Sequence, residues 1–182
     1  RNLIPLPFDD GVPVMPVRTW PREIPGALSP DLDELNIRTL YLRAVSSAKR
    51  SIYIEQQYLN NKALTKALVS RLAWARDNGI KDFRLTVILP TYYDEPRPVS
   101  SHMTWLQETC LNMLRQADPK EQHLRLFGLK AWNTRDLVYQ PLYIHAKLMV
   151  IDDRWLTVGS ANSNNRSFEF DTELNVAIED AK

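Results

Sequence analysis

Residues 143 to 162 place side chains capable of proton transfer and anion binding inside a segment that otherwise reads as buried β-sheet. The stretch is YIHAKLMVIDDRWLTVGSAN, and its apolar pattern predicts a strand over residues 142–151. Because side chains alternate along a strand, His145 and Lys147 lie on the same face, about 6 to 7 Å apart. An imidazole titrates near neutral pH and an ammonium is a cation, so one phosphate-sized anion can touch both. The pair therefore indicates an anionic substrate.

The residues that follow Lys147 point to the same anion. Gly159 lets the backbone of the GSAN turn come close to a ligand, and Asn162 can offer its side-chain amide. The next segment, SNNRSFEF, has the pattern of a capped helical turn, whose free N–H groups also favour negative charge. These features, together with His145, converge on one oxyanion.

The same segment resembles the HKD signature of the phospholipase D superfamily. Residues 145–162 read His-x-Lys-x(4)-Asp-x(6)-Gly-Ser-x-Asn without a gap. The stretches SAKRSIYIEQQYL, GSANSNNRSFEFDTELN and VMPVRTW are similar to parts of the second half of a two-motif phospholipase D, with Gln56 in place of the usual Asn. Residues 1–10 and 91–140 match only loosely. The chain thus resembles the C-terminal half of such an enzyme.

The resemblance implies a role for each polar residue of the signature. In this family one histidine attacks phosphorus to form a phosphohistidine, and a second, across a pseudo-twofold interface, protonates the leaving oxygen. His145, in the second-half motif, is expected to be the general acid. Lys147 and Asn162 are expected to bind the non-bridging oxygens and to stabilise the five-coordinate transition state. Glu173, in DTELN, matches the carboxylate that hydrogen bonds the other nitrogen of the histidine.

Three further residues belong to the expected site, each with a competing interpretation. The hydroxyl of Ser160 either reaches the substrate or only forms the Gly-Ser bend. Gln57 is expected among the substrate-binding groups or their supports, with a solvated strand edge as the alternative. Asp152 is the third letter of the motif and is counted with the catalytic set. Its parity differs from that of His145, however, so we expect it to brace the turn by hydrogen bonding.

The elements that must position these residues follow a βαβαβ order. Helical periodicity begins near Ile37, Leu64 and Met103, and the runs SIYIEQQYL, FRLTVILP and HLRLFGLKAW read as strands. The tail from Tyr143 adds two closely linked strands. We therefore expect an α/β fold, a mixed, largely parallel β-sheet flanked by helices on both faces. Residues 1–30 hold seven of the twelve prolines and are expected to form an extended lead-in with one short strand near VPVMPVRTW.

Composition bounds the class of protein. A length of 182 residues predicts a single phospholipase D-like domain over residues 1–182. The formal net charge of +1 argues against nucleic acid as a partner. The three histidines and the single cysteine show no metal-ligand spacing, so neither a metal nor a cofactor is expected. Cys110 falls in an apolar-periodic helix pattern and is expected to be buried and inert.

One signature supplies only one of the two histidines that the chemistry needs, so a partner is implied. The favoured interpretation is a phospholipid-cleaving or phosphatidyl-transferring enzyme in which a second HKD-bearing half comes from the same polypeptide or from another subunit. The alternatives are a single-motif homodimeric phosphodiesterase or endonuclease, and a non-catalytic lobe. Peripheral contact with a membrane through Tyr92, Tyr93 or Trp105 is left open.

Overall fold

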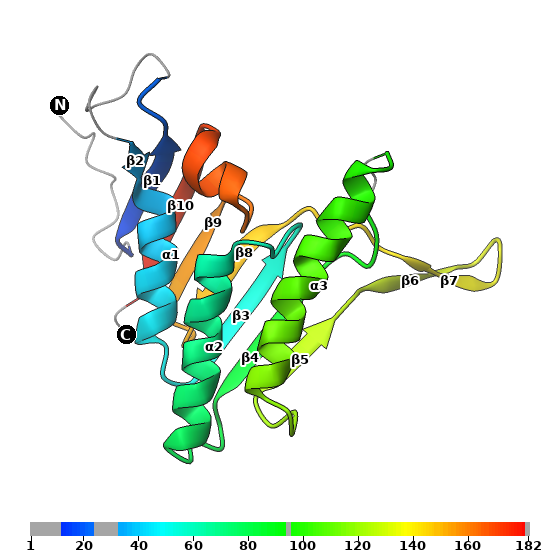
Figure 1. Ribbon diagram of the computed structural model, residues 1–182, viewed down its shortest axis with the longest axis horizontal. Helices are drawn as coiled ribbons and strands as arrows, with labels where there is room; N and C mark the ends of the chain where they lie inside the picture. The colour runs from blue at the N-terminus through cyan, green and yellow to red at the C-terminus, as the bar shows by residue number, and fades with distance from the viewer. Residues whose placement is uncertain (1–11, 24–32, 94–95, 181–182) are drawn as a thin grey trace.

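The computed structural model describes residues 12–23, 33–93 and 96–180, and at its centre lies an eight-stranded sheet (Figure 1). The order of strands across the sheet is β2-β1-β10-β9-β8-β3-β4-β5. Their bounds are β1 Val14–Trp20, β2 Glu34–Leu35, β3 Ser51–Gln56, β4 Arg84–Ile88, β5 Leu124–Phe127, β8 Lys147–Ile151, β9 Trp155–Gly159 and β10 Glu173–Glu179. The expected mixed α/β sheet is confirmed. It is less parallel than expected: of its seven neighbouring pairs only β3–β4 and β4–β5 are parallel.

The parallel part of the sheet is built by two helical crossovers, as the βαβαβ order predicts. α2 (Lys62–Asp77) connects β3 to β4, and α3 (Val99–Ala117) connects β4 to β5. α2 begins where the side chain of Asn61 accepts a hydrogen bond from the amide of Leu64, which satisfies one of the free N–H groups of the first turn. It ends at Asn78 and Gly79, and Gly79 adopts a positive φ of 65°. Local sequence signals therefore set both ends of this helix.

The helices gather on one face of the sheet. α2 packs between α1 (Asn36–Ser47) and α3, and Figure 1 shows all three in front of the strands. The core lies beneath them, where side chains such as Ile54, Leu85 and Leu68 are buried. Each such side chain contributes about 1.5–3 kcal/mol when it leaves water. The second helical layer expected on the opposite face is not found in the described residues.

The expected strand over residues 123–132 is interrupted. β5 ends at Phe127, and the chain then forms a separate hairpin of β6 (Lys130–Asn133) and β7 (Val138–Pro141), which projects beyond the sheet in Figure 1. The interruption falls at Gly128, where a Cβ atom would lie 2.3 Å from Cγ2 of Thr91. A side chain there would require the methyl group of Thr91 to turn aside, so glycine suits the place where the chain leaves the sheet.

The remaining expectations for the ends of the chain and for Cys110 fit the structure where it describes them. β1 forms near VPVMPVRTW and pairs with β10, whereas residues 1–11 and 24–32 of the lead-in region lie outside the described residues. Cys110 is buried in α3, and this burial raises the pKa of its thiol. Of the described helices, none is long and apolar enough to cross a bilayer.

Candidate active site

His145 lies in the connection between β7 and β8, with an exposed side chain. The strand predicted over residues 142–151 is shorter than expected, because β8 begins only at Lys147. Upstream, the amide of Leu142 donates to the carbonyl of Leu129 in the hairpin, so the chain follows the hairpin and not β3. The ring of Tyr143 stacks beside the imidazole with centroids 6.4 Å apart. No hydrogen bond to the imidazole occurs within the described part of the chain, which leaves both ring nitrogens available to a ligand or to water.

Lys147 holds its ammonium in a buried position next to His145. The residue is 8% exposed, and Nζ donates to Oε1 of Gln57 at 3.0 Å and to the carbonyl oxygen of His145 at 2.9 Å. An ammonium has three donors, so one remains for a ligand. Burial lowers the pKa of Lys147, and the nearby charge of Glu173 acts in the opposite direction. The site thus contains a poorly solvated cation that an anion would stabilise.

Gln57 connects Lys147 to the aromatic side chains around His145. It is buried, and its Nε2 donates to the hydroxyl of Tyr143 at 2.8 Å and to that of Tyr58 at 3.1 Å. One amide therefore fixes the position of the ammonium through its oxygen and that of Tyr143 through its nitrogen. The structure places Gln57 as a support for Lys147, with no solvated strand edge around it.

The GSAN turn is brought beside the start of β8 by β3. Gln56 pairs with Lys147 across the two strands, and its Oε1 accepts from the amide of Ser163 at 3.3 Å. The Oδ1 atom of Asn162 is buried and has no hydrogen-bond partner among the described residues. Half a turn of the amide exchanges its oxygen and nitrogen, so the group can present either a donor or an acceptor. An unsatisfied polar atom in this place is typical of a site that completes itself with a ligand or water.

A buried polar network holds the turn from below. Oδ1 of Asn175 accepts from the amide of Ala161 at 3.1 Å, and its Nδ2 donates to the hydroxyl of Tyr41 at 3.3 Å and to Oγ1 of Thr157 at 3.2 Å. Burial raises the pKa of the Tyr41 hydroxyl far above its ordinary value, so the network stays uncharged. Sequence reasoning missed Asn175 and Tyr41. The available signal was an asparagine at an inward position of a strand, where a buried amide needs partners.

Gly159 permits a close approach of strands that the sequence did not predict. A Cβ atom there would lie 2.4 Å from Oδ1 of Asn175 and 2.4 Å from the carbonyl oxygen of Leu174. The glycine therefore permits the close approach of β9 to β10. The expected close approach to a ligand is not needed to explain it.

Glu173 and Ser160 contact each other at the edge of the site. The hydroxyl of Ser160 donates to the carboxylate of Glu173, and it accepts from the amide of Leu174 at 3.1 Å. The expected hydrogen bond from His145 to Glu173 does not occur in the described residues. Glu173 acts electrostatically on Lys147 instead, and its orienting role toward the histidine stays a prediction.

Asp152 lies at the opposite end of β8 from His145. Its carboxylate accepts from the amides of Lys49, Arg50 and Ser51 at 2.7 to 2.8 Å. The five residues of β8 lie between it and His145, about 16 Å of extended chain. The place of Asp152 in the catalytic set stays a prediction. Its hydrogen bonds are the bracing that its parity predicts.

The helical turn expected after the GSAN segment is present. η1 comprises Arg166–Phe170, and Oδ1 of Asn164 accepts from the amide of Ser167 at 2.8 Å. This hydrogen bond satisfies one of the N–H groups that were expected to be free for an anion. Of the other histidines, His102 stacks on Trp105 of α3, and His123 is buried with Nδ1 3.1 Å from the carbonyl oxygen of Phe83.

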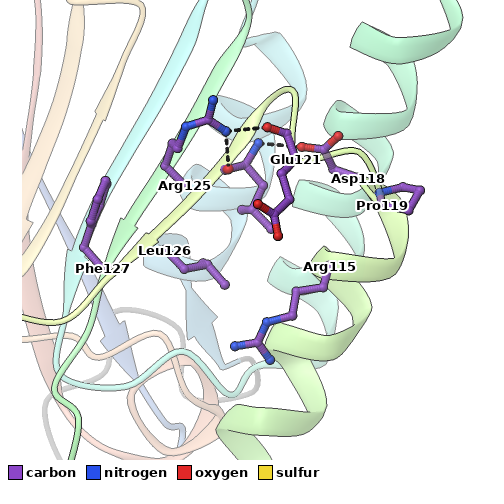
Figure 2. Close-up of a pocket in the computed structure, with 8 residues that line it drawn as sticks. Arg115, Asp118, Pro119, Glu121, Arg125, Leu126 and Phe127 are labelled. Carbon is purple, nitrogen blue, oxygen red and sulfur yellow. Dashed lines mark hydrogen bonds between the residues drawn. The ribbon is translucent and has the colours of Figure 1, made fainter.

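A cluster of metal-ligating side chains or a cavity elsewhere in the molecule would be a further candidate ligand site. Within the described ranges no group of three or more His, Cys, Asp or Glu side chains is placed to hold a metal ion. Figure 2 shows a cavity of about 490 Å³ between the end of α3 and β5, which no residue of the His145 site lines. Arg125 there donates to the carbonyl oxygens of Glu121 and Leu124. We assign this cavity no ligand.

Comparisons with known proteins identify related sequences and folds. Residues 41–182 match the family described as cardiolipin synthase, PLD-like domain. The chain is 30% identical over 172 residues to phospholipase D A of Dictyostelium discoideum, an alignment that covers 81% of this chain and 13% of that protein. It is 29% identical over 151 residues to cardiolipin synthase 2 of Staphylococcus epidermidis, covering 83% of this chain and 26% of that protein. The chain thus spans a small part of the curated relatives it matches.

Solved structures share the fold at lower sequence identity. The phospholipase D family member Nuc from Salmonella typhimurium has a TM-score of 0.56 at 18% identity, over 93% of this chain and 84% of that one. Phosphatidylserine synthase of Haemophilus influenzae has a TM-score of 0.60 at 18% identity, over 93% of this chain and 35% of that one. At these identities the likeness concerns the fold alone.

Proposed function

This chain belongs to the phospholipase D superfamily, whose members related to it are phosphodiesterases and phospholipid-modifying enzymes, and from this premise we propose that it forms one half of a phospholipase D-type active site. The single HKD-bearing domain over residues 1–182 supplies His145, Lys147 and Asn162. A second HKD-bearing half, from the same polypeptide or another subunit, supplies the other histidine. The substrate is a phospholipid, which is hydrolysed or transferred to an alcohol.

The observation that carries the proposal is the buried ammonium of Lys147, which donates to the backbone carbonyl oxygen of His145, a residue whose imidazole is exposed. Two hydrogen bonds hold this cation, and one N–H group is left over. Such a cation is costly in a folded protein unless an anion completes its surroundings. A phosphodiester is an anion whose cleavage also requires a proton donor, which His145 can be.

The chemistry proceeds in two balanced steps. In the first, the histidine of the other half attacks phosphorus, the bond from phosphorus to the head-group oxygen breaks, and His145 gives its proton to that oxygen. In the second, His145 takes a proton from water or an alcohol, whose oxygen attacks the phosphorus of the phosphohistidine, and the P–N bond breaks to release the other half's histidine. Lys147 and Asn162 bind the non-bridging oxygens while the transition state gathers charge. Ser160 and Glu173 border the site, and the charge of Glu173 acts on Lys147.

The second candidate is a self-sufficient homodimer of single-motif chains. It is favoured by the likeness to Nuc, which extends over 84% of that chain, in contrast to the small share of the curated relatives. Two copies of His145 would then face each other across a twofold axis. A non-catalytic lobe is the third candidate, and the intact set of His145, Lys147 and Asn162 argues against it.

The test combines activity with the state of assembly. Light scattering of the purified chain distinguishes a monomer from a dimer, and hydrolysis of phosphatidylcholine is measured with and without the second HKD-bearing half. We expect a monomer that gains activity only with that half, and a phosphohistidine trapped by an alkaline denaturing quench, in which its P–N bond is stable. Activity of a dimer of this chain alone would replace the first candidate by the second, and unchanged activity in His145→Asn would refute both.

A further inference from the structure

The β6–β7 hairpin concentrates the exposed apolar surface of the molecule. Of the sixteen large apolar residues that are exposed in the described chain, seven lie between residues 127 and 142. They are Phe127, Leu129, Trp132, Leu137, Val138, Tyr139 and Leu142. Four of them, Trp132, Leu137, Val138 and Tyr139, belong to the hairpin itself, which forms its own two-stranded sheet and projects from the body in Figure 1, and none of these four is in the buried core.

The hairpin has one aromatic face. Trp132 and Tyr139 are directly paired, and their rings meet edge to face with centroids 5.0 Å apart. Lys130 and Pro141 form the pair two residues further along, so by the alternation of strands they lie on the same side. We call Lys130, Trp132, Tyr139 and Pro141 the aromatic face. Trp132 is 49% exposed and Tyr139 is 67% exposed. Large exposed apolar patches usually mark a place of contact, so this face is a candidate binding surface.

The chemistry of this face fits the headgroup region of a bilayer. Trp and Tyr combine an apolar ring with a polar tip and therefore favour the boundary between hydrocarbon and water. Lys130 can lay its stem on apolar surface while its ammonium meets lipid phosphates. Residues 127–142 carry two cations, Lys130 and Arg135, against one carboxylate, Asp136. That carboxylate already accepts a hydrogen bond from Asn133 at 2.8 Å, which leaves the cations for an anionic surface.

The hairpin is also joined directly to the candidate active site. Pro141 precedes His145 by four residues, at most about 13 Å of extended chain. Between them, Tyr143 stacks beside the ring of His145 and contacts the ring of Tyr92. A surface held by the aromatic face therefore lies close to the imidazole.

We propose that the β6–β7 hairpin is an interfacial anchor that seats its aromatic face in the headgroup layer of an anionic phospholipid bilayer and brings lipid phosphates to His145. The delivery of lipid phosphates to His145 rests on the proposed function. The binding step requires no catalysis and can be measured separately.

The first experiment measures vesicle binding by the purified chain. Vesicles of phosphatidylcholine with phosphatidylserine are titrated into wild type, and tryptophan emission is expected to shift to the blue and to be quenched by brominated lipid. Trp132→Phe is expected to lose this response. Trp105→Phe removes another exposed tryptophan, 60% exposed on α3, and is expected to keep it. Loss of the response in Trp105→Phe, with its retention in Trp132→Phe, would overturn the anchor.

The second experiment measures affinity in a matched pair of variants. Trp132→Ser combined with Tyr139→Ser is expected to weaken co-sedimentation with these vesicles about tenfold or more, since two interfacial rings are removed. Trp105→Ser is expected to leave it unchanged, and circular dichroism checks that each variant folds. Unchanged binding by the double variant would overturn the proposal, as would a double variant that loses only association with another protein chain.

A third measurement separates the anchor from the proposed function. In the assembled enzyme the double variant is expected to slow vesicle hydrolysis about tenfold and to leave a water-soluble phosphodiester, bis(p-nitrophenyl) phosphate, unaffected. An equal loss on both substrates would contradict the anchor. If vesicle binding depends on Trp132 but His145→Asn changes no activity, the anchor stands and the proposed function fails.

Discussion

The two ends of β8 carry polar residues of one sequence signature in opposite states. At the start of the strand, Lys147 keeps a free donor, the ring of His145 has no hydrogen bond in the described residues, and Oδ1 of Asn162 is buried without a partner there. At the far end, Asp152 accepts from three backbone amides. The start of β8 thus has hydrogen-bonding groups left for a ligand, whereas the carboxylate of Asp152 at the far end stabilises the fold. The spacing of a motif does not show which of its residues can bind a ligand and which stabilise the fold.

The largest expected effect comes from removing His145, the proposed proton donor near the start of β8. His145→Asn is expected to lower kcat of the assembled enzyme by about 10²–10⁴-fold, the usual contribution of a positioned acid or base. Its melting temperature is expected to stay near that of wild type, because the side chain is exposed and makes no hydrogen bond in the described residues. Hydrolysis assays and thermal melts measure the two effects. The matched control is His102→Asn, an exposed histidine of α3, which is expected to change neither.

Removing the buried cation is expected to have the next largest effect. Lys147→Met should lower kcat/KM for a phosphodiester about a hundredfold or more, since a charge that stabilises the transition state is lost. Lys62→Met, at an exposed position of α2, serves as the control. Turnover at the wild-type rate would remove Lys147 from the proposed site.

Lys147→Met is also expected to change how the free energy of unfolding depends on pH. Because the pKa of Lys147 is lowered from its ordinary 10.5 in the folded state, the unfolded state binds more protons between the folded pKa and 10.5. The free energy of unfolding therefore rises with pH in that window, and Lys147→Met is expected to flatten this rise. Denaturant titrations over alkaline pH measure it.

Substitution of Asp152, at the far end of β8, is expected to change the stability of the protein and not its activity. Asp152→Asn weakens hydrogen bonds to three amides and should lower the free energy of unfolding by about 2–4 kcal/mol, with kcat of the folded fraction retained. Asp153→Asn is a close control, because both residues have positive φ in the same turn and Asp153 is exposed. It is expected to change stability by less than about 0.5 kcal/mol. A loss of kcat without a loss of stability in Asp152→Asn would reverse the comparison.

The smallest expected effect concerns Glu173. Its charge raises the pKa of Lys147 against the effect of burial, so Glu173→Gln is expected to lower that pKa further. The alkaline limb of kcat/KM, where Lys147 loses its proton, should then move to lower pH. Asp171→Asn, at a carboxylate paired with Arg166, should leave the profile unchanged. An alkaline limb that does not move in Glu173→Gln would contradict this electrostatic role.

Much of the fold was predictable because it depends on local patterns. The crossovers between β3, β4 and β5 follow from helical and strand periodicity, and the end of α2 at Asn78 and Gly79 follows from a glycine signal. The sheet is nevertheless mainly antiparallel, because the C-terminal strands pair with β3 and β1 across long separations in sequence. Periodicity contains no information on such pairings.

The candidate site was predictable in its residues and less so in its contacts. His145, Lys147 and Asn162 follow from one continuous signature, whereas the supporting amides of Gln57 and Asn175 reach it from other strands. The start of β8 at Lys147 moved His145 off the strand, because Leu142 bonds to the hairpin. A strand prediction cannot anticipate a hydrogen bond to a hairpin that forms elsewhere in the chain.

The amino-acid sequence alone determined which side chains the protein has for phosphate chemistry, the order of its helices and strands, and its resemblance to the phospholipase D superfamily, since these depend on residue types and short-range spacing. Only the tertiary structure decided that Asp152 braces the fold, that Gly159 serves β10, and that an aromatic hairpin adjoins His145. The reason is physical: hydrogen bonds and burial depend on partners that are distant in the chain, and folding brings them together.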